Sequence, residues 1–453
     1  MTSLIKGGNS KSRRNFIRML AMSPLLPYLN LSAQMKEEVH KATIDPRFTH
    51  DTLHVEDPDG LAPGLAESMA DYDAHITSAS QAIIVFDLEA VARRNLNVGH
   101  LAQMLGSEDG ATYMANREAF SKVQLRPRVL VDARDVDVSV TLFGKKWNTP
   151  LLVCPIGAQR AFHPDAELAV ARAAKSRGHL MTLSTSSSTP IEEVNAAYGQ
   201  PVWFQLYRYE DWSRTLAMIK RAESSGCKTL VWTLDALYPD KREGLARVRR
   251  DNVKLCQQCH NVPDHEGFNP KLLNNAGFEE RIPRPMRTTP PVGPKEIVPG
   301  LTWDYVKRLK DSTSMKVVLK GITASEDAAL ALRHGADGIW VSNHGGRVVN
   351  TGRGTLECLP EISTVVGKRI PIIVDGGFRR GTDIYKALAL GATAVGVGRP
   401  YLWGMAAFGQ EGVEVMFDIL DTELKMVMAQ MGTPRIPAVT RRAIISSIRP
   451  SAT

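Results

Sequence analysis

Polar and ionisable side chains follow the apolar segment Ile339–Val341. The next residues are Ser-Asn-His-Gly-Gly-Arg, which places His344 and Arg347 close together around Gly345 and Gly346. A histidine can act as a general base near neutral pH, and an arginine can hold an anionic group such as a carboxylate. The glycines let the backbone turn sharply or approach a ligand. The segment therefore indicates a base beside an anion-binding group, although an ordinary turn can carry the same residues.

The elements that must position these residues are short β-branched segments alternating with helical ones. We expect strands over 151–154, 180–183, 202–206, 229–234, 316–319, 338–341, 371–374 and 393–397. Segments with helical spacing separate nearly all of these strands, among them 165–176, 211–224, 324–334 and 382–390. Eight strand–helix units in this length predict an α/β fold, the TIM (β/α)8 barrel, whose site lies at the carboxyl ends of the strands. Polar residues close the predicted strands there: Ser184, Gln205, Tyr207, Thr233, Asp235, Lys320, Ser342, Asn343, His344, Asp375 and Arg399.

Two later segments, Asp375-Gly376-Gly377-Phe378-Arg379-Arg380 and Gly398-Arg399-Pro400, complete a pattern with the His344 segment. From about Phe120 to about Gly432 the chain resembles the FMN-dependent 2-hydroxy acid dehydrogenase/oxidase family. That family includes glycolate oxidase, lactate and mandelate dehydrogenases and the flavin domain of flavocytochrome b2. The resemblance implies FMN as cofactor and oxidation of an L-type 2-hydroxy acid to the 2-oxo acid.

The resemblance assigns roles to individual residues. His344 matches the family's base, Asp235 the carboxylate that holds it, Arg347 the substrate-carboxylate anchor, and Tyr207 the tyrosine near the substrate oxygen. Lys320 matches the lysine at the flavin N1/O2 edge. The remaining residues implied to bind FMN are Pro155, Ile156, Gly157, Ser184, Gln205, Thr233, Ser342, Asp375, Gly376, Gly377, Arg379, Gly398 and Arg399. Two arginines with glycine amides can neutralise a phosphate at the last two strands.

The chain departs from the family pattern at three places. A tyrosine ahead of the segment Gly106–Asp109 falls here near Ala102, so its hydroxyl is missing. The active-site arginine after the fourth strand is matched to Lys241, which keeps the charge without the bidentate fork. Val348-Val349-Asn350 follows Arg347 where Gln-Leu-Asp is common. These changes favour a larger or less usual hydroxy acid. An FMN-barrel isomerase or a silent flavoprotein is the alternative outside this enzyme class.

Composition sets the broad limits. The 453 residues are 43% hydrophobic and 23% charged, with a net charge of +8. A basic surface attracts acidic substrates, acidic partners or anionic lipid. We expect no nucleic-acid partner, because no nucleic-acid motif accompanies the charge. No apolar segment is long enough for a mature membrane-spanning helix. A homo-oligomer and peripheral membrane contact are both expected.

The N-terminus resembles a twin-arginine export signal, with Arg13-Arg14 before an apolar stretch from Met19 to Leu31. A basic tail is the alternative. We favour export over residues 1–33, and hence a periplasmic location, with 34–81 as an extension or linker and 82–450 as the flavin barrel. An N-terminal helical cap is expected over 82–105. An exported enzyme of this type more plausibly passes electrons to a quinone or cytochrome than to dioxygen, although the oxidase reading stays open.

The alternation breaks over 240–300, which predicts a lid or partner-binding excursion. It contains Cys256-Gln257-Gln258-Cys259-His260, which fits a c-type haem attachment motif. Three interpretations compete: covalent haem, a disulfide or metal staple, and an idle thiol pair. We favour the staple, because a haem domain normally needs its own helical pocket and a second axial ligand.

Overall fold

A computed structural model describes residues 76–207, 212–236, 241–251 and 301–448. Residues 1–75, which hold the predicted export signal and most of the linker, lie outside the described residues, as do Cys256, Cys259 and His260. All described residues fall within one compact unit, Asp73–Thr453. Within the described part of the chain, no helix has the length and apolar character to cross a membrane.

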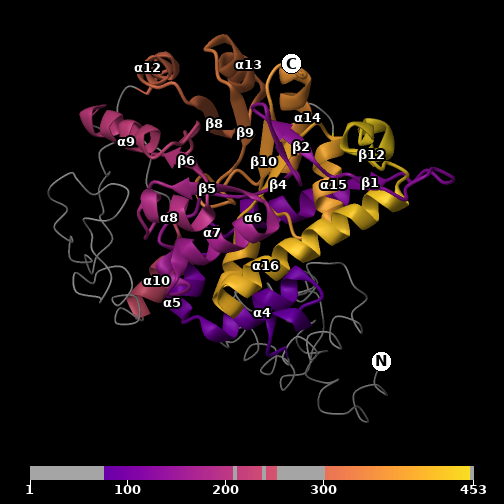
Figure 1. The fold of residues 1–453 in the computed structure, drawn as a ribbon, viewed down its shortest axis with the longest axis horizontal. Coiled ribbons are helices and arrows are strands. Elements are labelled where there is room, and N and C mark those ends of the chain that lie inside the picture. Colours follow the sequence, from indigo (N-terminus) through magenta and orange to yellow (C-terminus); the bar gives the residue numbers. More distant parts are fainter. Residues whose placement is uncertain (1–75, 208–211, 237–240, 252–300, 449–453) are drawn as a thin grey trace, which may run out of the picture. The chain divides into compact units, whose positions relative to one another are not determined.

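Eight parallel strands close into a barrel (Figure 1). The strands are β4 (Leu151–Val153), β5 (Leu180–Ser184), β6 (Trp203–Leu206), β7 (Thr229–Thr233), β8 (Lys316–Ile322), β9 (Gly338–Val341), β10 (Ile372–Asp375) and β11 (Ala394–Val397). Each pairs with its sequence neighbour, and β11 pairs with β4 to close the ring. The predicted TIM barrel is confirmed. Seven predicted strands lie within one residue of their expected bounds, and β8 runs three residues further than expected.

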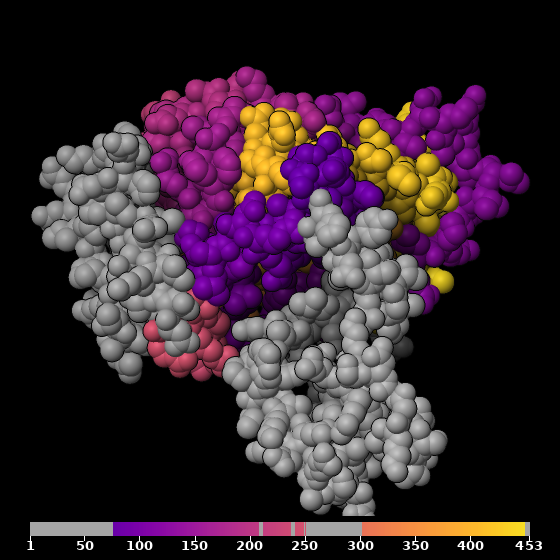
Figure 2. Space-filling model, turned by 90° about the horizontal axis from the view of Figure 1, so that it is seen from below, coloured from indigo at the N-terminus to yellow at the C-terminus, as the bar shows by residue number. Residues whose placement is uncertain are grey.

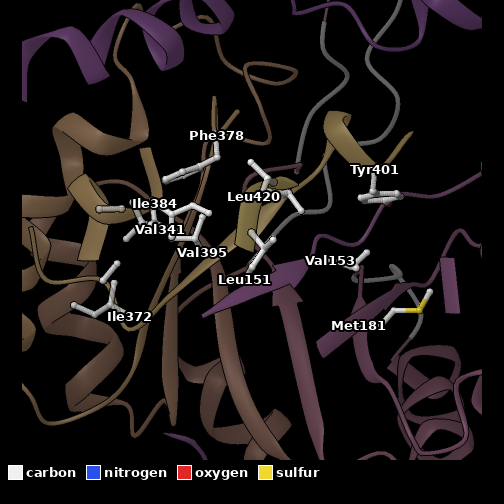
Figure 3. Packing of buried hydrophobic residues seen from close by; sticks show 14 of the residues in the cluster. Leu151, Val153, Met181, Val341, Ile372, Phe378, Ile384, Val395, Tyr401 and Leu420 are labelled. Atoms are coloured by element: carbon white, nitrogen blue, oxygen red, sulfur yellow. The ribbon is translucent and has the colours of Figure 1, made fainter. Parts of the chain in front are cut away.

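Helices cover the outside of the barrel. They are α7 (Ala166–Arg177), α8 (Ile191–Tyr198), α9 (Trp212–Ser224), α12 (Asp304–Ser312), α13 (Ser325–Arg333), α14 (Thr355–Val366), α15 (Gly381–Ala389) and α16 (Arg399–Gln430). One set of alternating strand residues packs against these helices. In Figure 3, Val341 and Val395 lie beside Ile384 of α15, and Leu151 lies near Leu420 of α16.

The other alternating set fills the barrel interior. It includes Leu152, Trp203, Val318 and Trp340. Gly396 provides room for Trp340, because an added Cβ would lie 2.9 Å from the indole ring. The barrel is therefore a packed core and not a pore. Residues two positions further along the strands keep the same inward direction but lie at the carboxyl-terminal mouth, which is where polar side chains replace apolar ones.

The predicted helical cap over 82–105 is two helices, α4 (Val85–Asn95) and α5 (Val98–Ala102), with Leu96 extended between them. A third helix, α6 (Ala111–Glu118), follows, and α4, α5 and α6 together are called the N-terminal cap. Asn95 donates hydrogen bonds to the Ala406 and Ala407 carbonyls of α16. Figure 2 shows the indigo N-terminal residues lying against the yellow C-terminal ones. The cap is thus joined to the last barrel helix.

Two small two-stranded sheets and one further helix complete the described chain. β1 (Val123–Leu125) pairs with β12 (Ile444–Ser446), and β2 (Val140–Leu142) pairs with β3 (Lys145–Trp147). Apolar side chains of β2 and β3 pack in the cluster that fills the barrel interior, so this hairpin covers one end of that cluster. The helix α10 (Glu243–Asp251) is the described part of the predicted excursion.

Candidate active site

A hydrogen-bonded chain of three side chains lies at the strand ends. Asp235 Oδ1 lies 2.9 Å from Nδ1 of His344, and Nε2 of His344 lies 3.2 Å from the Tyr207 hydroxyl. These residues follow β7, β9 and β6, so three strand ends converge on one imidazole. Because Asp235 accepts from Nδ1–H, the neutral imidazole presents an unprotonated Nε2 to the site. The arrangement supplies a base whose cationic form is stabilised by a carboxylate.

Burial and neighbouring charges set the protonation states of Asp235 and Tyr207, the two partners of His344. Burial acts to raise the pKa of Asp235, but the charges of His344 and Lys320 and the hydrogen bond from His344 together lower it below its ordinary value. Burial raises the pKa of Tyr207 and outweighs the opposing effect of the nearby cations Lys320, Arg347 and Arg242. Near neutral pH the carboxylate is therefore ionised and the phenol carries its proton.

A second cluster lies deeper in the mouth of the barrel. Lys320 donates to the Ser342 hydroxyl at 2.6 Å and lies 3.1 Å from Asp375 Oδ2, while Ser342 donates to Asp375 Oδ1 at 2.8 Å. Burial acts to lower the pKa of Lys320, but the charges of Asp375 and Asp235 raise it above its ordinary value. The ammonium group is thus held as a cation inside the protein.

A chain of neutral polar groups lies on the adjoining strand ends. Ser184 donates to Gln205 Oε1 at 3.1 Å, and Gln205 Nε2 donates to Thr233 Oγ1 at 3.0 Å. All three side chains are buried. Next to this chain, the loop after β4 carries Pro155, Ile156 and Gly157, and an added Cβ at Gly157 would lie 2.7 Å from Ser186.

Two buried guanidinium groups mark an anion site at the loops after β10 and β11. Burial lowers the pKa of Arg379 to about 10 and also lowers that of Arg399. Nη2 of Arg399 is buried without a hydrogen-bond partner among the described residues. Gly376 and Gly377 adopt φ of +109° and +83°, and Gly398 precedes α16. Among the described residues neither guanidinium group has a carboxylate partner, and cations of this kind beside glycine amides fit a phosphate group.

The residues present therefore fit FMN. An anion site lies at the loops after the last two strands, a buried cation and a neutral hydrogen-bonding chain lie across the barrel mouth, and a base stands at its rim. Every residue that the sequence assigned to the cofactor lies on these strand ends or on the loops that follow them: Pro155, Ile156, Gly157, Ser184, Gln205, Thr233, Lys320, Ser342, Asp375, Gly376, Gly377, Arg379, Gly398 and Arg399.

The substrate-side cations differ in part from the sequence prediction. The Lys241 side chain is 77% exposed and pairs with Glu243 at 2.8 Å, so it points to solvent. Its neighbour Arg242 is partly buried, and its charge acts on the Tyr207 hydroxyl. The exposed position of Lys241 does not support its assignment to the substrate. The adjacent Arg242 was visible in the sequence, but the sequence did not show which of the two side chains is exposed.

Arg347 and Ala102 lie near one another at the end of α5. Arg347 donates to the Gln103 carbonyl, and its charge also acts on Tyr207. Ala102 ends α5, directly before Gln103. Sequence reasoning did not find Asn116 or Arg117 of α6, although Arg117 donates to the Gly377 carbonyl at 2.6 Å. No motif marked them, because their contacts are with residues more than two hundred positions away.

Comparison with known proteins agrees with this geometry. Residues 92–446 match the family model described as FMN-dependent dehydrogenase. A 2-hydroxyacid oxidase of Dictyostelium discoideum is 40% identical over 342 residues, covering 75% of this chain and 84% of that protein. An L-lactate oxidase of Nostoc sp. is 38% identical over 375 residues, covering 80% and 97%. The crystal structure of mandelate oxidase with benzoyl-formic acid superposes with a TM-score of 0.68 at 36% identity, covering 82% and 100%.

The barrel, the anion site and these matches lead to one assignment. The chain belongs to the FMN-dependent dehydrogenase family, and it is an FMN-dependent oxidoreductase acting on 2-hydroxy acids.

Proposed function

We propose that this protein oxidises an L-2-hydroxy acid of the lactate or mandelate kind to the 2-oxo acid, with His344 as the base. The hydrogen-bonded chain Asp235–His344–Tyr207 carries the proposal, because it directs a proton acceptor into the mouth of the barrel. The names of the relatives, among them L-lactate oxidase and 4-hydroxymandelate oxidase, support this substrate class.

In this proposal the protein's own residues bind and orient the acid. Arg347 and Arg242 attract the substrate carboxylate, since both charges act at the Tyr207 hydroxyl. The protonated Tyr207 hydroxyl donates a hydrogen bond to the substrate oxygen. Nε2 of His344 accepts a proton from the substrate. Asp235 then stabilises the imidazolium through Nδ1. This orienting carboxylate is the same device that serves a catalytic triad.

Pro155, Ile156 and Gly157 would hold FMN by their backbone, and Ser184, Gln205 and Thr233 by hydrogen bonds to the flavin ring. Bound FMN supplies the two-electron acceptor. Lys320 would offset negative charge on the bound flavin, and Ser342 and Asp375 fix its ammonium group. Arg379, Arg399, Gly376, Gly377 and Gly398 would neutralise and enclose the phosphate.

For the electron acceptor we propose dioxygen, because the relatives in this comparison are oxidases by name. This reverses the preference for a quinone or cytochrome that the export-like residues 1–33 suggested. The exported dehydrogenase remains the second candidate, and residues Arg13 and Arg14 are the observation that favours it.

An anaerobic panel of L- and D-2-hydroxy acids tests the proposal. We expect lactate or mandelate analogues of the L series to bleach the flavin absorbance, and D acids to leave it unchanged. Oxygen uptake with a bleaching substrate then separates an oxidase from a dehydrogenase. A flavoprotein that none of these acids bleaches would refute the proposed substrate class.

A further inference from the structure

A buried pair of amides joins the N-terminal cap to the loop that carries His344. Asn116 of α6 donates through Nδ2 to Asn343 Oδ1 at 3.0 Å, and Asn343 donates through Nδ2 to Asn116 Oδ1 at 2.9 Å. The side chains are 2% and 6% exposed. Asn343 directly precedes His344, so this pair fixes the base from a segment outside the barrel.

Backbone N–H groups fix the orientation of both amides. Asn116 Oδ1 also accepts from the Thr355 amide at 3.1 Å, and Asn343 Oδ1 also accepts from the Gly346 amide at 3.2 Å. A backbone amide can only donate, so each oxygen must face its amide and each NH2 must face the other side chain. Asn343 Nδ2 additionally donates to the Arg353 carbonyl at 3.1 Å. Neither side chain can flip without losing several buried hydrogen bonds.

His344 needs such restraint because its backbone is in the left-handed region, with φ of +57°. A non-glycine residue held there is strained, and the surrounding structure must offset this cost. The Ser342 hydroxyl accepts from the His344 amide at 3.1 Å, on one side of the residue. Asn343 holds the other side, since both its carbonyl and its Oδ1 accept from the Gly346 amide.

Asn116 also contacts the loop after β10. An added Cβ at Gly377 would lie 2.3 Å from the Asn116 carbonyl, and one at Gly376 would lie 2.8 Å from Asn116 Oδ1. Thr355, whose backbone amide donates to Asn116, also donates its hydroxyl to the Asp375 carbonyl at 2.5 Å. Asn116 therefore lies against both the loop of the base and the loop of the phosphate site.

We propose that Asn116 is a positioning residue that holds His344 in its left-handed conformation relative to the cofactor loop. This inference rests on the proposed role of His344 as the base. It assigns the N-terminal cap a function in the chemistry, in addition to its packing against α16.

The test is the isosteric variant Asn116→Asp. Its carboxylate still accepts from the Thr355 amide, but its second oxygen faces Asn343 Oδ1, where no hydrogen bond can form. We expect the limiting rate of flavin reduction to fall by about 10²-fold, as for small misplacement of a reacting group. The half-saturating substrate concentration should change little. Hydrogen–deuterium exchange of the 342–347 peptide should become faster, while the 394–397 peptide stays protected.

The matched control is Asn95→Ala, which removes another amide that joins the cap to the barrel but has no contact with the His344 loop. Asn95→Ala should leave the rate of flavin reduction and the exchange of the 342–347 peptide unchanged. If Asn116→Asp does not fold, Asn116→Ala removes the same donor without adding charge, and it should give the same changes.

Unchanged exchange at 342–347 in a folded Asn116 variant would overturn the proposal whatever its activity. An unchanged reduction rate in the variant, beside an active wild type, would do the same. A wild type that no hydroxy acid reduces would instead refute the proposed function, and the exchange comparison would still decide whether Asn116 holds the loop.

Discussion

Asp235 and His344 lie 109 positions apart in the sequence, yet Oδ1 of the first is 2.9 Å from Nδ1 of the second. The contact leaves Nε2 of His344 facing Tyr207. A base in this position needs an orienting partner and a protonation state that the partner stabilises. Asp235, at the end of β7, provides both for His344, which follows β9.

Replacing the base tests its role directly. His344→Ala should still bind FMN, because the flavin-binding side chains other than Ser342 lie on other strand ends and the substitution leaves Ser342 in place. Reduction of the flavin by substrate should fall by at least about 10²-fold, as is typical for loss of a general base. Stopped-flow absorbance under anaerobic conditions measures the rate, and a variant that reduces at the wild-type rate would show that another group takes the proton.

Asp235→Asn should retain the base but lose the stabilising charge, so the reduction rate should fall less than in His344→Ala. The variant should also reveal the contribution of the carboxylate to stability. Because the pKa of Asp235 is lowered below its ordinary value of 3.8 in the folded protein, ionisation stabilises the fold above that pH and this contribution is lost below it.

Urea unfolding at about pH 5 and about pH 3 measures this effect. The stability difference between wild type and Asp235→Asn should shrink at the lower pH. A difference that is equal at both values would contradict the lowered pKa.

Arg379 provides a test of the phosphate site. In Arg379→Gln, affinity for FMN should fall, because a buried cation assigned to the phosphate site is removed. Affinity for riboflavin, which has no phosphate, should change much less and serves as the internal control. Fluorescence titration of the apoprotein with both flavins gives the two affinities, and equal losses would place the phosphate elsewhere.

Variants of Lys241 and Arg242 together test which of the two neighbouring cations binds the substrate carboxylate. Arg242→Ala should raise the half-saturating concentration of the hydroxy acid, because its charge acts at the Tyr207 hydroxyl. Lys241→Ala should have little effect, because that side chain is exposed and pairs with Glu243. Steady-state kinetics of the two variants compares them, and the opposite ranking would restore the original assignment of Lys241.

The predicted export signal and the Cys256–Cys259 pair are tested together by fractionation and mass spectrometry. Changing Arg13 and Arg14 to Lys should retain the flavin-loaded protein in the cytoplasm, if residues 1–33 direct export. The exported wild type should have lost two hydrogens, as expected for a disulfide in an oxidising compartment. A haem-sized addition would instead make the electron acceptor internal.

The sequence determined the barrel and most of its site because both depend on local patterns. Short β-branched segments alternate with helical ones, and the polar residue that ends each strand necessarily lies at the mouth of a parallel barrel. Lys320, Ser342 and Asp375 were therefore expected at the mouth of the barrel without coordinates. That they form one hydrogen-bonded cluster is shown by the structure, in which β8, β9 and β10 are adjacent strands.

Only the tertiary structure decided which residues outside the strands reach this mouth. The sequence does not distinguish Lys241 from Arg242, whereas the structure shows Lys241 exposed and paired with Glu243 and the charge of Arg242 acting on Tyr207. The break of the cap at Leu96 and the Asn116–Asn343 pair depend on packing between segments that are distant in sequence. Such contacts leave no periodic signal, because they are fixed by the assembled fold and not by neighbouring residues.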